Sequence, residues 1–299
     1  MTISVAFIGL GVMGYPMAGF LQKQGHKVTV FNRSSGKAEA WAAEFGGKMA
    51  LTPRAAAEGA EFVFACVGND DDLRQVTLGE EGAFAGMSSG TVFVDHTTTS
   101  AQVAKELAEF AQGKGIDFFD APVSGGQAGA ESGKLTVMVG GSEANYSKVA
   151  NIIQCYARCV ERLGPVGSGQ LCKMVNQICI AGVVQGLAEG LHFAKAAGLD
   201  ASQVVDVISK GAAQSWQMEN RYKTMLSNDY EHGFAVDWMR KDLAIVLDES
   251  KRNNTRLALT ERVDQYYAEV QKMGGGRWDT SSLLARLEAE LLDDSYKQD

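Results

Sequence analysis

The sequence has no surplus of basic residues that could attract a polyanion. Lysine and arginine number 28 against 36 acidic residues, so the formal net charge is −8 with the histidines neutral. Proteins that bind nucleic acid use clustered lysines and arginines to release counterions from the phosphates. The charge balance therefore argues against a nucleic acid as partner.

Cysteine and histidine are too few and too irregularly spaced to form a structural framework. The five cysteines are an odd number at spacings that match neither a zinc site nor a disulfide pattern. We expect them to be reduced core residues, which favours a cytoplasmic protein. The four histidines form no ligand pattern, so we expect no metal.

The N-terminus lacks the features of a targeting segment or a membrane span. No basic region precedes the apolar stretch from Val5, and glycine and proline interrupt that stretch by residue 16. Neither a signal peptide nor a membrane contact is therefore expected. What the chain does have is length and apolar content, because 299 residues that are 45% hydrophobic suffice for two domains with substantial cores.

Short apolar runs alternate with helix-like segments through the first half of the sequence. The runs are too continuous for strands with one solvent-exposed face, so they predict a mainly parallel sheet covered by helices on both faces. We expect strands over 4–9, 27–32, 61–68, 91–97, 116–123, 135–141 and 157–164, and helices over 15–25, 36–46, 52–60 and 100–115.

After residues 163–170 the apolar positions become spaced as in helices, and almost no strand signal remains. Helices are expected over 171–200, 201–213 and 239–253. The first runs for about 30 residues without proline, which predicts a central helix packed on every side that also serves a subunit interface. The predicted fold is an α/β domain over 1–164 followed by an all-α domain over 165–299.

A glycine-rich loop lies between the first predicted strand and the first predicted helix. In this setting the first glycine makes a tight turn, the second lets backbone N–H groups reach a pyrophosphate, and the third lets the helix pack on the strand. The alternative is a plain turn, but the strand before and the helix after favour a dinucleotide in a Rossmann-type domain. The loop comprises Gly9, Leu10, Gly11, Val12, Met13 and Gly14.

The end of the second predicted strand bears on the choice of cofactor. An acidic residue there bonds the 2′-hydroxyl of NAD(H), whereas an arginine accommodates the 2′-phosphate of NADP(H). This chain has Asn32, Arg33 and Ser34 and no acid. We therefore predict NADP(H), with Arg33 facing the phosphate; a solvated arginine and use of NAD(H) is the alternative.

Three further segments, 95–98, 120–126 and 167–177, lie at the ends of predicted elements, where α/β proteins bind ligands. Lys173 stands three and four residues before Asn176 and Gln177, so an amine and an amide share one helix face. An isolated cation in so apolar a run is costly unless it is used, which favours function over a surface position. Asp95 and Asp120 are expected to cap strand or helix ends rather than to catalyse.

Five motifs together resemble the β-hydroxyacid dehydrogenase family. They are GLGVMG, DHTTTS, DAPVSGG, GSGQLCKMVNQ and RKDLAIVLD, in family order and at family-like distances over nearly the whole chain. The resemblance implies a Rossmann-type domain to about Gly164 and an all-α domain used for dimer or tetramer contacts. It also implies hydride transfer between a nicotinamide cofactor and a small carboxylate substrate, either a β-hydroxyacid or its semialdehyde.

The resemblance also assigns roles to single residues. Lys173 would be the catalytic lysine, Thr98 would lie near the nicotinamide, and Lys241 would close over cofactor and substrate. One departure concerns the amide, because many members have asparagine where this chain has Gln177, and Asn176 comes one residue earlier. Which of the two touches the substrate is left open. The substrate carboxylate cradle would be Ser124, Gly125 and Gly126.

The chemistry suits these residue types. Lysine can give or take the hydroxyl proton where burial brings its pKa toward neutrality, and its ammonium stabilises the charge that develops on oxygen. A serine hydroxyl and glycine N–H groups suit a carboxylate, although a plain turn is the alternative at Ser124, as a solvated helix face is at Lys241. An imine reductase-like enzyme and a non-catalytic cofactor-binding module are the rival functions.

Overall fold

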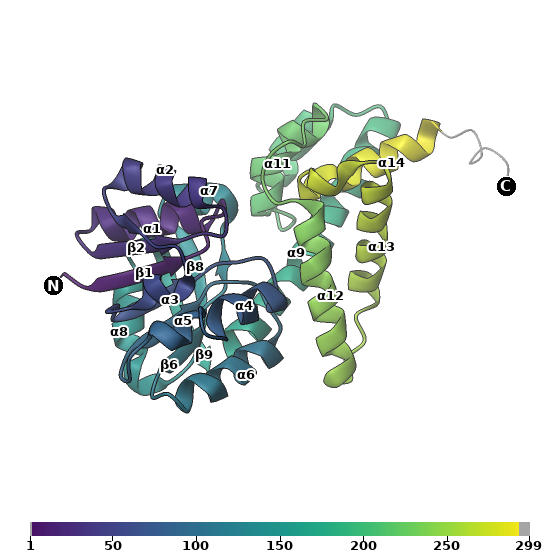
Figure 1. Cartoon of the computed structure of the whole chain (residues 1–299). Helices are drawn as coiled ribbons and strands as arrows, with labels where there is room; N and C mark the ends of the chain where they lie inside the picture. Colours follow the sequence, from purple (N-terminus) through teal and green to yellow (C-terminus); the bar gives the residue numbers. More distant parts are fainter. Residues whose placement is uncertain (1, 293–299) are drawn as a thin grey trace. The chain divides into compact units, whose positions relative to one another are not determined.

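The computed structural model describes residues 2–292 (Figure 1). The chain divides into two compact units, Met1–Lys173 and Met174–Asp299. The division falls inside the helix α9 (Ser168–Ala196), so the first turns of α9 belong to unit 1. The sequence-based boundary between 164 and 165 lies just before this helix.

Unit 1 is built on one sheet. In the described part of the chain its strands follow the order β3-β2-β1-β4-β5-β6-β8-β7, with β9 paired to β8. Neighbours from β3 to β6 are parallel, as are β8 and β9, while β8 is antiparallel to β6 and β7. The strands are β1 (Ser4–Ile8), β2 (Lys27–Phe31), β3 (Lys48–Met49), β4 (Phe62–Ala65), β5 (Val92–Asp95), β6 (Asp117–Asp120), β7 (Val123–Ser124), β8 (Leu135–Gly140) and β9 (Ala157–Gly164).

The mainly parallel sheet and all seven predicted strands are confirmed. The sequence pattern does not signal β3 and β7, because two residues are too few to show a periodicity. The four predicted helices of unit 1 are also present, together with four that were not expected. The helices are α1 (Gly14–Lys23), α2 (Ser35–Phe45), α3 (Pro53–Ala57), α4 (Asp70–Thr77), α5 (Ala83–Gly86), α6 (Ala101–Gln112), α7 (Gly126–Glu131) and α8 (Glu143–Ile153).

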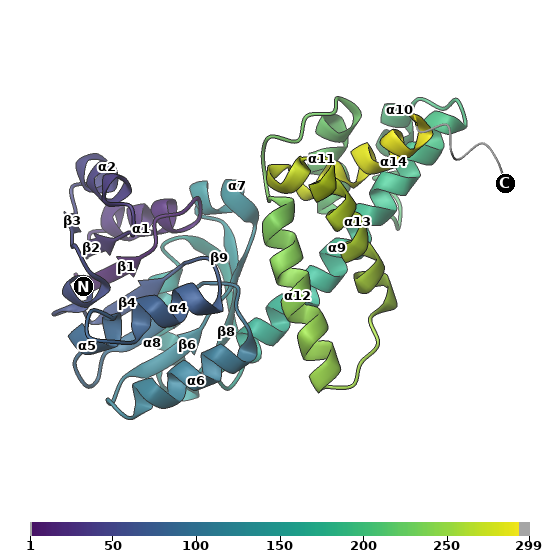
Figure 2. The same cartoon turned by 45° about the vertical axis from the view of Figure 1, so that its right-hand side comes forward.

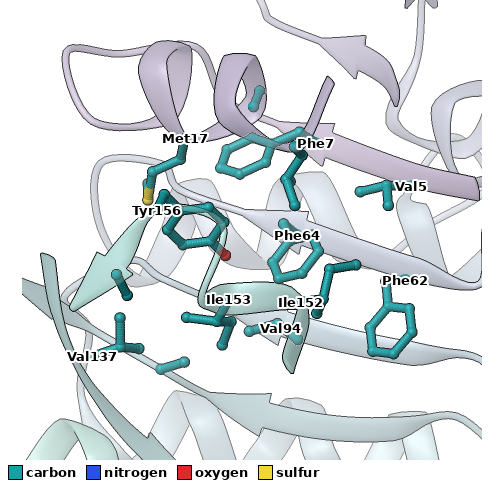
Figure 3. Packing of buried hydrophobic residues seen from close by; sticks show 14 of the residues in the cluster. Val5, Phe7, Met17, Phe62, Phe64, Val94, Val137, Ile152, Ile153 and Tyr156 are labelled. Atoms are coloured by element: carbon teal, nitrogen blue, oxygen red, sulfur yellow. The ribbon is translucent and has the colours of Figure 1, made fainter. Parts of the chain in front are cut away.

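Helices cover both faces of the sheet, as the continuous apolar strands predict. Alternate residues of β1 show this directly. Val5 and Phe7 pack with residues of α1 and α8 (Figure 3) and with residues of α2, whereas Ala6 and Ile8 pack with α3, α5 and α6. Figure 2 shows the sheet between α1 and α2 on one side and α4 and α6 on the other. Burial on both faces fixes the strands, and thereby the loops at their carboxyl ends.

Unit 2 is helical, as predicted. Its core gathers apolar residues of α9 with those of the later helices, among them Leu191, Met239, Leu243 and Tyr267. The helices after α9 are α10 (Ala201–Ile208), α11 (Trp216–Leu226), α12 (Val236–Arg252), α13 (Ala258–Lys272), α14 (Leu283–Leu292) and the short 3₁₀ turns η1 (Gly275–Arg277) and η2 (Thr280–Ser282).

The expectation that the long helix is packed on every side is wrong for the single chain. One face of α9 is buried, but Leu171, Val175, Val183 and Phe193 are exposed. Their spacings of four, eight and ten residues place these side chains on one stripe of the helix. Within residues 2–292, α9 is the helix that is long and apolar enough to cross a membrane, and its buried side belongs to the core of unit 2.

Candidate active site

Close packing explains the outer glycines of the loop between β1 and α1. A Cβ atom at Gly9, where φ is +95°, would clash with the carbonyl oxygen of Cys66, and one at Gly14 would clash with the carbonyl oxygen of Gly9. At Gly11 a Cβ atom would meet nothing within 4 Å. The first and third glycines therefore allow packing, while the second leaves the approach to the backbone open, as expected for a pyrophosphate.

Bonds from the end of β2 hold this loop. The N–H of Gly9 donates to the carbonyl oxygen of Phe31 at 2.8 Å, and the N–H of Leu10 donates to Oδ1 of Asn32 at 2.8 Å. Met13, the N-cap residue of α1, makes no side-chain capping bond. The first N–H groups of a helix have no partner inside it, and the helix dipole favours an anion there. The open backbone and the uncapped helix fit a dinucleotide cofactor.

Asn32, Arg33 and Ser34 follow β2 without an acidic residue. Nδ2 of Asn32 donates to the carbonyl oxygen of Ser34 at 3.1 Å, which stiffens the turn. The Arg33 side chain is 83% exposed, and its Nη1 lies 3.4 Å from Oδ1 of Asp72 on α4. Arg33 is therefore accessible to an anion, and Asp72 competes for the same guanidinium.

The Lys173 amine is held beside the predicted carboxylate cradle. Lys173 is only 8% exposed, and its Nζ donates to the carbonyl oxygen of Val123 at 2.9 Å. Ser124 follows Val123 directly on β7, and Gly125 and Gly126 come next with φ of +131° and +61°. Residues other than glycine rarely adopt these backbone conformations, so this turn depends on glycine at both positions. Unit 1 thus brings the lysine and the cradle together.

Asp120 at the end of β6 anchors the start of α9, the helix that carries Lys173. Its Oδ1 accepts from the N–H of Gly167 at 2.7 Å and its Oδ2 from the N–H of Gln170 at 2.8 Å. The expected capping role of Asp120 is confirmed, and the capped helix lies 47 residues further along the chain. Burial raises the pKa of the Asp120 carboxyl to about 6, and the donated N–H groups lower it in part.

Asp95 ends the neighbouring strand β5 and shapes the segment around Thr98. Its Oδ1 accepts from the N–H of Thr97 at 2.9 Å, and the hydroxyl oxygen of Thr97 accepts from the N–H of Val67 at 3.0 Å. Burial raises the pKa of Asp95 to about 7, with a smaller contribution from the charge of Asp120. Like Asp120, Asp95 therefore shapes backbone at a strand end.

His96 is a buried neutral side chain rather than a candidate base. Its Nδ1 lies 2.6 Å from the carbonyl oxygen of Ala121, and its Nε2 lies 2.7 Å from the hydroxyl of Tyr156, whose ring is labelled in Figure 3. A carbonyl oxygen only accepts, so Nδ1 carries the proton and Nε2 accepts from the tyrosine. Burial lowers the pKa of His96 to about 4, so the ring stays neutral at physiological pH.

The amide candidates and Lys241 lie in unit 2. Nδ2 of Asn176 donates to Oε1 of Gln177 at 2.8 Å, and Nε2 of Gln177 donates to Oδ2 of Asp242 at 2.7 Å. Gln177 is 3% exposed, whereas Asn176 is only partly buried, so Asn176 is the more accessible of the two amides. Nζ of Lys241 lies 3.0 Å from Oδ1 of Asp242. The roles of Asn176 and Lys241 stay predictions.

Two residues important for this geometry have no local signal in the sequence. Gln170 forms hydrogen bonds with the backbone on both sides of Thr98, and the Tyr156 hydroxyl forms a buried hydrogen bond with His96. Gln170 stands inside one of the motifs singled out above, yet its partners lie more than 70 residues away, so only the fold reveals them.

Comparisons with known proteins find relatives over nearly the whole chain. Residues 4–164 match the NAD binding domain of 6-phosphogluconate dehydrogenase, and residues 167–287 match the NAD-binding family of NADP-dependent 3-hydroxyisobutyrate dehydrogenase. An uncharacterised oxidoreductase of Shewanella frigidimarina is 66% identical over 95% of this chain and 98% of its own. A probable 3-hydroxyisobutyrate dehydrogenase-like protein of Arabidopsis thaliana is 39% identical over 95% of this chain and 85% of its own.

More distant relatives and solved structures widen the comparison. The 2-hydroxy-3-oxopropionate reductase of Escherichia coli is 32% identical over 96% of this chain and 97% of its own. The 3-hydroxyisobutyrate dehydrogenase of Mycobacterium tuberculosis, solved with L-serine, is 28% identical with a TM-score of 0.86, over 96% of this chain and 99% of that one. An imine reductase of Myxococcus stipitatus covers 96% of this chain and 100% of its own, but at 18% identity and a TM-score of 0.64 it shows the fold alone. The chain belongs to the β-hydroxyacid dehydrogenase family and is an oxidoreductase of that family with an NAD(P)-binding domain.

Proposed function

We propose that the chain transfers a hydride between NADP(H) and a small β-hydroxyacid or its semialdehyde, with Lys173 as general acid and base. The nicotinamide supplies or accepts the hydride. Lys173 takes the hydroxyl proton in oxidation and gives it back in reduction, and its ammonium stabilises negative charge on the substrate oxygen. The resemblance to the family supports Thr98 beside the nicotinamide and Lys241 over cofactor and substrate.

The observation that carries the proposal is the Lys173 contact with Val123. The hydrogen bond from the buried ammonium to the carbonyl oxygen of Val123 holds the amine at the edge of the predicted cradle, where a bound substrate would meet it. The carbonyl belongs to the residue before Ser124, so a carboxylate bound by Ser124, Gly125 and Gly126 would place its β-hydroxyl near the amine. Holding both ends of a small substrate fixes the position of the reacting carbon, and this orientation raises the rate of the reaction.

A substrate panel tests the class of reaction. Each compound is assayed with NADP(H) and with NAD(H), alcohols in the direction of oxidation and aldehydes in the direction of reduction. The panel comprises 3-hydroxyisobutyrate, L-serine, 2-hydroxy-3-oxopropionate, glyoxylate, succinic semialdehyde and 4-hydroxybutyrate. We expect turnover of at least one of these carboxylates, and none of a matched alcohol that lacks the carboxylate. Binding of NADPH without turnover of any member would instead support a non-catalytic cofactor-binding module.

The imine reductase alternative has weaker support. Solved imine reductases share the fold, but the imine reductase of Myxococcus stipitatus is only 18% identical to this chain. In that branch a different acid commonly replaces the lysine, and this chain has Lys173 at the start of α9. Reduction of a cyclic imine faster than of every carboxylate in the panel would favour the alternative.

We further propose a homo-oligomer, a dimer or a tetramer, in the cytoplasm. The exposed apolar stripe on α9, formed by Leu171, Val175, Val183 and Phe193, supports a contact with a second copy. The five free thiols support a reducing compartment. Light scattering on the purified protein tests the assembly, since a monomer at all concentrations would contradict it, and cell fractionation tests the compartment.

A further inference from the structure

Gln170 on the first turn of α9 is fully buried and uses both ends of its amide on one short segment. Its Nε2 donates to the carbonyl oxygen of Thr97 at 2.7 Å, and its Oε1 accepts from the N–H of Thr99 at 3.1 Å. The two bonds bracket Thr98. A side-chain amide has one donor and one acceptor group side by side, so it pairs with an extended backbone segment as a neighbouring strand would.

The helix turn that carries Gln170 is itself immobilised. The N–H of Gln170 donates to Asp120, and a Cβ atom at Gly169 would clash with the carbonyl oxygen of Met138. A Cβ atom at Gly140 on the neighbouring β8 would clash with the Asp120 carboxylate. This close approach leaves the first turn of α9 little freedom to shift against β6 and β8.

Lys173 follows Gln170 by three residues, so the two side chains project from neighbouring positions on one helix face. Nζ of Lys173 is bonded to Val123, whereas the Gln170 amide is bonded around Thr98. One turn of α9 therefore joins the segment predicted to face the nicotinamide to the amine predicted to move the proton.

We infer that Gln170 is a positioning residue, whose amide sets the backbone at Thr98 at a fixed distance from Lys173. The inference rests on the proposed function, because it requires Thr98 beside the nicotinamide and Lys173 as the general acid and base. Asp95 and Val67 hold Thr97 through hydrogen bonds that do not involve α9. Loss of the Gln170 amide should therefore leave the 97–99 segment folded, but its position relative to α9 would no longer be fixed.

The test compares Gln170→Met, which keeps the side-chain length and removes both bonds, with Gln185→Met. Gln185 is another buried glutamine of α9, and its Nε2 donates to Glu189 at 2.6 Å. For Gln170→Met we expect kcat to fall about tenfold to a hundredfold, as for a misplacement of about 1 Å, with little change in the Kd of NADPH. For Gln185→Met we expect an unchanged kcat.

A kinetic isotope effect separates positioning from loss of structure. With NADPH deuterated at the transferred position, Gln170→Met should show a larger isotope effect on kcat than the unmodified protein, because hydride transfer becomes the slow step. A protein that is merely less folded would lose active molecules without changing the effect per turnover. If Gln170→Met does not fold, Gln170→Asn, which keeps the amide on a shorter side chain, is expected to show the same two changes.

The outcomes distinguish this inference from the proposed function. Normal kcat and an unchanged isotope effect in a folded Gln170 variant, beside an inactive Lys173→Met, would overturn the positioning role alone. Near-normal turnover of Lys173→Met would overturn the lysine chemistry and with it the inference. Lowered kcat, a raised isotope effect and a normal Gln185→Met would support both.

Discussion

The proposed preference for NADP(H) over NAD(H) rests on Arg33. Its side chain is 83% exposed and lies 3.4 Å from Asp72, so a 2′-phosphate would have to compete with a carboxylate for the guanidinium. Hydrogen bonds to charged groups are worth about 1.5–3 kcal/mol, which corresponds to about tenfold to a hundredfold in affinity.

Arg33→Asp should lower the ratio of kcat/KM for NADPH over NADH by about tenfold or more, because the new carboxylate repels the phosphate and can accept from a ribose hydroxyl. Steady-state assays with both cofactors measure this ratio. Arg158→Asp, the same charge change at an exposed position of β9, should leave the ratio unchanged. An equal ratio in Arg33→Asp and the unmodified protein would show that Arg33 does not bind the 2′-phosphate of NADPH.

At the scale of elements, two neighbouring strands end in buried carboxylates. Asp95 of β5 is the register partner of Asp120 of β6, and burial raises the pKa of Asp95 to about 7 and that of Asp120 to about 6. A carboxyl whose folded pKa lies above its ordinary 3.8 binds its proton more tightly in the folded state. Its contribution to stability is therefore full below about pH 4 and is lost as the pH rises through the folded pKa.

Asp95→Asn should remove this dependence for one of the two groups. Between about pH 4 and pH 7, the free energy of unfolding of the unmodified protein should fall relative to that of Asp95→Asn by about 1.4 kcal/mol per pH unit. His96, whose pKa is lowered to about 4, has the opposite sign but is present in both proteins. Urea unfolding at a series of pH values measures the difference.

A matched control for this experiment is Asp206→Asn, the same change at an exposed position of α10. Its free energy of unfolding should run parallel to that of the unmodified protein. If the Asp95→Asn curve also ran parallel, the Asp95 carboxyl would not hold its proton more tightly in the folded state.

How far the sequence predicts such elements depends on the range of the contacts. Strands, glycine loop and long helix follow from local periodicity and turn chemistry, and they are where the sequence places them. The bonds of Asp120 to α9 and of Gln170 to the Thr98 segment join residues 47 to 73 positions apart. No local pattern encodes such pairs, because they arise only once the strands are ordered in the sheet.

On the scale of the whole molecule, the sequence predicts the order of the two parts better than the exposure of their surfaces. Leu171 and Val183 on α9 are as apolar as its buried residues, so composition alone does not tell a core face from a contact face. Of the residues predicted to bind or react, the glycine loop, the cradle and Lys173 belong to unit 1, and Asn176 and Lys241 belong to unit 2.

On this scale the proposed function assigns the proton step to Lys173, and the rate of hydride transfer in Lys173→Met tests this assignment most directly. The rate is followed by the absorbance of the reduced nicotinamide after rapid mixing of the cofactor-bound protein with the best substrate of the panel. Lys195→Met, a lysine of the same helix paired with Glu288, is the control and should react at the unmodified rate. We predict a fall of about 10² to 10⁴ for Lys173→Met with NADPH binding retained. A rate within a few-fold of the control would contradict the assignment of Lys173 as the general acid and base.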